Sequence, residues 1–170
     1  MFCPVLNFMK YKKFIIGFIT AAVFLIAVSS LLLSKEKVLV ITDVEKDKKF
    51  EFIIPERKFV LSYIHSVQHT PAFEYMKIND DNTIELVETR FYSLGIGLPS
   101  SDENGAFENE DGEFVLKFNR IYEEINLRIS PIPEHSIEIN GVDYSLLDFA
   151  DPEDRVNLKV VDKWVIQGMK

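Results

Sequence analysis

The feature that most constrains this chain is a run of 20 residues without a charge, from Phe14 to Leu33. Thirteen of these residues are Phe, Ile, Leu or Val. As an α-helix the run would be about 30 Å long, which matches the hydrocarbon core of a bilayer. Its apolar side chains favour insertion by roughly 4–8 kcal/mol, more than the Thr and Ser residues of the run oppose. We therefore expect a transmembrane helix over residues 14–33.

The charges on either side of the apolar run predict its orientation. Three lysines precede the run, whereas the residues that follow it mix lysine with glutamate. Positively charged flanks stay on the cytoplasmic side of a membrane. We therefore expect a cell-membrane protein that crosses once, with residues 1–13 in the cytoplasm and residues 34–170 forming an extracytoplasmic domain.

A cleaved signal peptide is the alternative to this signal anchor. Ala27-Val28-Ser29 resembles a small-x-small cleavage site behind a basic N-terminus. The apolar run, however, exceeds the ordinary signal-peptide core of about 7 to 15 residues. Leu31–Leu33 also continues the run beyond the candidate cut, which favours a segment that is retained.

The composition of residues 34–170 excludes several classes of protein. All 27 acidic residues lie in this part, against 16 of the 19 basic ones, which gives a formal charge of −11. Such a domain lacks the basic surface that nucleic acid requires. The single cysteine, Cys3, precedes the apolar run, so this part contains no disulfide or thiolate metal site. Its length corresponds to one domain with one hydrophobic core.

Period-two alternation and turn residues dominate residues 38–170 and predict an all-β fold. Asn140-Gly141 lies between alternating segments and favours a type I′ hairpin turn. A second hairpin is predicted around the polar turn at residues 79–82. Roughly nine or ten short strands suggest a sandwich or an open barrel. The predicted strands span 38–42, 50–54, 59–67, 72–78, 83–91, 113–118, 125–129, 156–161 and 164–166, in addition to the hairpin at 137–144. A long loop is predicted at 93–106 and a helical turn around 119–124.

Two polar blocks, YIHSVQHTPAFEY at residues 63–75 and TRFYSLGIGLPS at residues 89–100, resemble a bacterial family known as domain of unknown function 1850. The resemblance extends over most of residues 38–168, and Ile96 stands where a small residue is usual. That family has no established activity, and its members are often encoded beside tripartite transporters of the TAXI type. The matching residues are Tyr63, His65, Ser66, Thr70, Pro71, Glu74, Thr89, Arg90, Phe91, Ser93, Gly95, Gly97, Leu98 and Pro99.

Neither a metal site nor a catalytic site is favoured by these blocks. On a strand His65 and His69 would lie about 13 Å apart, too far for one metal ion with ligands near 2 Å. His65 and Ser66 would point to opposite faces of a strand, and Ser93 lacks the glycine spacing of a nucleophile elbow. We therefore predict no metal, no cofactor and no catalytic residue, and keep a hydrolase as the third alternative.

A binding site is the remaining chemical interpretation. If the two blocks pair in the fold, His65, Glu74 and Arg90 would converge below a glycine loop, and Arg90 would receive a carboxylate. The competing structural interpretation is an ion pair between Glu74 and Arg90, with the glycines forming a tight turn. A small anionic ligand is therefore the second functional hypothesis.

The first functional hypothesis is a membrane-anchored extracytoplasmic accessory module. It would dock on a subunit of a transporter of the TAXI type or on its extracytoplasmic binding protein. The tether is inferred from the residues, whereas the transporter is implied by the family resemblance alone.

Overall fold

The computed structural model describes residues 11–12, 14–25, 33–65, 69–92, 107–110 and 112–166. Its contacts divide the chain into an N-terminal unit, residues 1–35 and 164–170, and a β unit, residues 36–163. Residues 14–25 of the predicted transmembrane segment are helical, and residues 26–32 lie outside the described residues. Leu33, the last residue of that predicted helix, instead begins a strand. Within the described ranges, no helix has the length and apolar character needed to cross a membrane.

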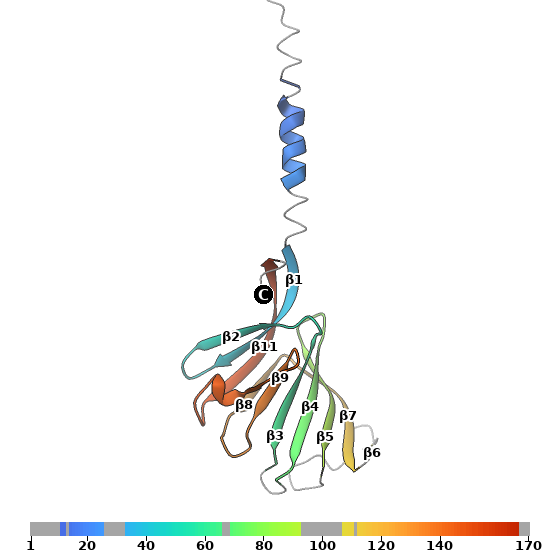
Figure 1. Ribbon diagram of the computed structural model, residues 1–170, viewed down its shortest axis with the longest axis vertical. Helices are drawn as coiled ribbons and strands as arrows, with labels where there is room; N and C mark the ends of the chain where they lie inside the picture. Colours follow the sequence, from blue (N-terminus) through green and yellow to red (C-terminus); the bar gives the residue numbers. More distant parts are fainter. Residues whose placement is uncertain are drawn as a thin grey trace, which may run out of the picture. The chain divides into compact units, whose positions relative to one another are not determined.

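The strands form two sheets, one with four strands and one with seven (Figure 1). All neighbouring strands of the seven-stranded sheet pair antiparallel. The four-stranded sheet has the order β2 (Lys48–Ile53), β1 (Leu33–Asp43), β11 (Arg155–Ile166) and β8 (Glu124–Arg128). The seven-stranded sheet has the order β10 (Val142–Ser145), β9 (Ser136–Ile139), β3 (Lys58–Ile64), β4 (Pro71–Ile78), β5 (Ile84–Phe91), β7 (Glu113–Tyr122) and β6 (Phe107–Glu110).

The alternating pattern of the strands produces one hydrophobic core between the two sheets. On β3, Phe59 and Leu61 are buried, while Val60 between them is half-buried on the other face. The same cluster contains Leu39 of β1 and Leu158 of β11 from the four-stranded sheet. The all-β prediction is therefore confirmed, as a two-sheet arrangement with a shared core.

Both predicted hairpins are present. Asn140 and Gly141 have φ angles of 53° and 78°, the left-handed conformation that a type I′ turn requires, and they join β9 to β10. β4 and β5 pair on either side of the predicted polar turn, where Asn82 also has a positive φ. After β10 the chain enters a single turn of 3₁₀ helix, η1 (Leu146–Asp148).

Several boundaries differ from the sequence prediction. The helical turn expected around residues 119–124 is wrong, because β7 stays paired with β5 there: Leu86 faces Arg120 and Ile84 faces Tyr122. The last two predicted strands are one continuous strand, β11, and the short strand β6 and the 3₁₀ turn η1 were not predicted. The predicted loop at residues 93–106 lies outside the described residues.

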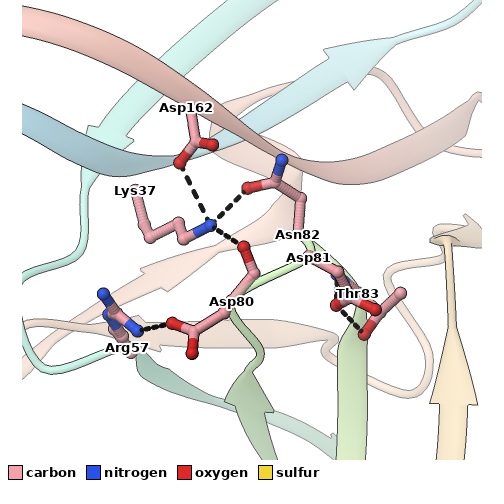
Figure 2. Close-up of polar contacts among 7 residues, drawn as sticks. All are labelled: Lys37, Arg57, Asp80, Asp81, Asn82, Thr83 and Asp162. Carbon is pink, nitrogen blue, oxygen red and sulfur yellow. Dashed lines mark hydrogen bonds and ion pairs between the residues drawn. The ribbon is translucent and has the colours of Figure 1, made fainter.

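A buried lysine joins the two sheets at the turn between β4 and β5. Lys37, on β1, is only 7% exposed. Its ammonium donates hydrogen bonds of 2.7 Å to the backbone oxygen of Asp80 and to Oδ1 of Asn82, and it lies 3.0 Å from a carboxylate oxygen of Asp162 on β11 (Figure 2). All three donors of the ammonium are therefore engaged.

Candidate functional site

The seven-stranded sheet separates the residues of the two polar blocks onto its two faces. Glu74 lies opposite Thr89 and points toward the core face, whereas Phe73 lies opposite Arg90 on the outer face. Neighbouring residues of a strand point to opposite sides of a sheet. The structure therefore does not bring Arg90 to Glu74, and it supports neither the shared pocket with His65 nor the Glu74–Arg90 ion pair.

A β-bulge in β5 causes this separation. From Ile78↔Ile84 to Met76↔Leu86 the pairing of β4 and β5 is regular, but the next pair is Tyr75↔Glu88. Val87 is therefore an extra residue, and an extra residue moves every later side chain to the other face. Without it, Arg90 would lie opposite Ala72 and share the core face with Glu74.

Arg90 is already engaged on the outer face. Its guanidinium forms a short ion pair with Glu88, lies 3.2 Å from a carboxylate oxygen of Glu113, and is stacked 5.5 Å from the ring centre of Tyr75. The hydrogen bond to Glu88 raises the pKa of Arg90 further, and the guanidinium stays charged. Two carboxylates neutralise this charge, so the site offers little to a small anion.

A second group of titratable residues gathers on the core face. Tyr63 of β3 is packed against the core, and Glu74 lies diagonally across the strand pair, since its direct partner is Leu61. The ring of His135 is centred 6.2 Å from that of Tyr63. Sequence reasoning missed His135, because it lies outside both blocks in the irregular segment before β9.

Burial changes the proton affinity of this group. Burial raises the pKa of Glu74, and the positive charge of Arg120 opposes that effect. The pKa of Tyr63 is raised by burial and by the neighbouring charge of Glu74, while burial lowers the pKa of His135. Each shift favours the neutral form of the side chain. The three half-buried side chains therefore favour an uncharged group at this place in the sheet.

We predict that Glu74→Gln stabilises the domain at neutral pH. Because the folded-state pKa of Glu74 is raised above 4.5, the stability gained from its protonated form is present below pH 4.5 and is lost as the pH rises through the folded-state pKa. Thermal unfolding at pH 7.5 should show a Tm increase on the order of 3 °C, the effect of about 1 kcal/mol in a domain of this size. At pH 4 the difference should be smaller.

Glu138→Gln is the matched control for this substitution, because Glu138 is exposed on the outer face of the same sheet. It should change Tm little at either pH. A lower Tm of Glu74→Gln at both pH values would show that the carboxylate stabilises the fold, contrary to this prediction.

Backbone hydrogen bonds connect His65 to His69 and Thr70 within the first polar block. The backbone N–H of His65 donates to the backbone oxygen of Thr70, and the backbone N–H of His69 donates to the backbone oxygen of His65. His69 has a φ of 52°, in the left-handed region. His65 is buried, and Pro71 begins β4 opposite Ile64. Ser66, Ser93, Gly95, Gly97 and Pro99 lie outside the described residues. Among the residues that are described, no three His, Cys, Asp or Glu side chains form a group able to hold a metal ion.

The outer face of the seven-stranded sheet is hollowed beside the Arg90 cluster. The hollow has a volume of about 970 Å³, and Val60, Phe73, Tyr75 and Val87 contribute apolar surface to it. Its charged border carries ion pairs: Arg57 with Asp80, Lys58 with Glu56, and Lys77 with Glu85. Asp80 belongs to the turn that Lys37 anchors (Figure 2). Because Asp80 also lines the hollow, the junction of the two sheets fixes one side of it.

Fold and site together define an all-β domain with a buried titratable group on one face of its larger sheet and an apolar hollow on the other. The family of the chain follows from a comparison with protein-family models. Residues 59–146 match the family described as Domain of unknown function (DUF1850), which is just over half of the 170 residues. The chain belongs to this family, and the predicted resemblance is confirmed. Comparisons with curated proteins and with solved structures gave no match.

Proposed function

We propose that this protein is a membrane-anchored docking module of the bacterial cell envelope, which binds a partner protein through the outer face of its seven-stranded sheet. The observation that carries the proposal is the hollow on that face. Apolar and aromatic side chains surrounded by charged groups are the usual anatomy of a protein interface. Tyr75 is suited to such a contact, because it combines a large apolar ring with a hydroxyl group.

The charges around the hollow favour a protein partner over a small anion. Each cation named on its border is already within an ion pair, and Arg90 has two carboxylates. A free anion would have to displace these carboxylates, whereas a protein surface can cover the apolar centre and leave the pairs at the rim. The small anionic ligand is therefore the weaker hypothesis.

The proposal also includes a membrane anchor at the N-terminus and a transporter component as the partner protein. The 20 uncharged residues from Phe14 to Leu33 would hold the domain at the membrane with its C-terminus outside the cytoplasm. For the partner, the family resemblance points to a transporter of the TAXI type, either a membrane subunit or its extracytoplasmic binding protein. An acidic domain of formal charge −11 would prefer a basic patch on that partner.

Site-specific photo-crosslinking in native membranes tests this function. A photoreactive amino acid replaces Val60, which lines the hollow, in the full-length chain. The matched control carries it at Lys159, an exposed position on β11 of the other sheet. We expect one discrete adduct from position 60, identified by mass spectrometry as a transporter component, and none from position 159.

Two results would contradict the proposal. Equal labelling from both positions would show that the outer face of the seven-stranded sheet is not a specific interface. An adduct from position 60 with an unrelated protein would keep the docking surface but reject the transporter as its partner.

A further inference from the structure

The C-terminal end of β11 carries an exposed apolar surface close to the start of β1. Trp164 is 70% exposed and Ile166 is 50% exposed. Residues two apart on a strand share one face, so the two side chains project on the same side of β11. Removing this apolar surface from water would be favourable.

The pairing of β1 and β11 places this surface beside the start of β1, at the end of the apolar N-terminal run. The two strands are neighbours and run in opposite directions (Figure 1). Lys37 contacts Asp162 across them. Continuing antiparallel pairing from that contact by two and then four residues brings Trp164 near Lys35 and Ile166 near Leu33. Accordingly, residues 164–170 and residues 1–35 belong to one compact unit.

We propose that Trp164 and Ile166 lie in the headgroup layer of the membrane that holds the N-terminal segment, and that Trp164 anchors the end of β11 there. Leu33 ends the uncharged run, and Lys35 is two strand residues further, at most about 7 Å away. The polar layer on each side of a bilayer is about 5–8 Å thick. The proposal rests on the membrane anchor of the proposed function.

The chemistry of the two side chains fits a lipid headgroup layer. Tryptophan concentrates at membrane interfaces because its ring is apolar while its N–H donates a hydrogen bond to water or to a lipid headgroup. The neighbouring isoleucine adds apolar surface on the same face. Held at two points, by the N-terminal segment and by Trp164, this end of the four-stranded sheet would keep a fixed orientation to the bilayer.

The fluorescence of Trp164 tests the proposal directly, because it is the only tryptophan of the chain. Full-length protein is reconstituted into vesicles of phosphatidylcholine and phosphatidylglycerol, with and without lipids brominated near the headgroup end of the acyl chain. We expect blue-shifted emission and a loss of roughly half of it in the brominated vesicles. The control is Trp164→Phe combined with Tyr92→Trp, which moves the reporter to an exposed position just after β5 and should show neither effect.

Alkaline extraction of the same vesicles separates the two proposals. Protein that stays in the membrane but shows no quenching of Trp164 would overturn the interfacial contact and leave the anchor standing. Protein that is extracted would overturn the anchor, and the interfacial contact with it. Equal quenching of the control would show a general association of the domain with lipid, which also overturns a specific role of Trp164.

Discussion

Replacing Lys37 by methionine should lower the free energy of unfolding by about 3 kcal/mol, which corresponds to a fall in Tm of roughly 10 °C. Methionine keeps the length and the apolar stem of the side chain but removes its ammonium. The backbone oxygen of Asp80 and Oδ1 of Asn82 then lose their donor, and the carboxylate of Asp162 loses its buried counter-charge. A buried acceptor without a partner costs about 1–3 kcal/mol. The two acceptors here are part-buried and Asp162 is partly exposed, so each contributes toward the lower end of this range.

Urea unfolding monitored by circular dichroism measures this effect. The sample is the isolated unit of residues 36–163 if that unit folds alone, and the full-length protein in detergent otherwise. Lys49→Met is the matched control, because Lys49 is exposed and paired with the exposed Asp47. It should change stability by less than about 0.5 kcal/mol. Equal effects of the two substitutions would show that the Lys37 junction does not stabilise the fold.

Replacing Phe149 by alanine should cost about 3–5 kcal/mol. Phe149 follows η1, is 6% exposed, and has its ring centre 4.9 Å from that of Phe50, 5.8 Å from that of Phe52 and 6.0 Å from that of Tyr144. Phe50 and Phe52 belong to β2 of one sheet and Tyr144 to β10 of the other. Alanine would therefore leave a cavity where the ring closes the two sheets against each other.

Phe149→Leu separates the volume of the ring from its aromatic contacts. Leucine retains most of the apolar volume, so its loss in free energy of unfolding should be less than half that of alanine. A loss below about 1 kcal/mol for alanine would mean that the surrounding side chains close the cavity, contrary to this prediction. The same denaturation measurement serves both variants. An unchanged dependence on urea concentration would confirm that the native state has lost stability without becoming less compact.

Local chemistry made most of the strands predictable from the sequence. The hairpin of β9 and β10 follows from Asn140-Gly141, because few other residue pairs accept a positive φ at two successive positions. The core face of β3 follows from alternation, and Phe59 and Leu61 are indeed buried. Period-two patterns identify such faces because one side of each sheet packs on the core.

Pairing partners were less predictable than strands. A helical turn was predicted around residues 119–124, yet β7 continues through Tyr122, since its neighbour β5 supplies the hydrogen bonds. The buried Lys37 could not be recognised either. Its three partners come from β11 and from the turn between β4 and β5, more than 40 residues away in the sequence.

The sequence by itself determined the apolar N-terminal run, the all-β class, the two hairpins and the family. Only the tertiary structure decided which polar residues meet. One extra residue, Val87, turns Arg90 away from Glu74 and onto the outer face. The physical reason is that side chains alternate strictly along a strand, so a local bulge moves every later side chain to the opposite face. Bulges arise from the pairing of two strands rather than from the residue pattern of one strand.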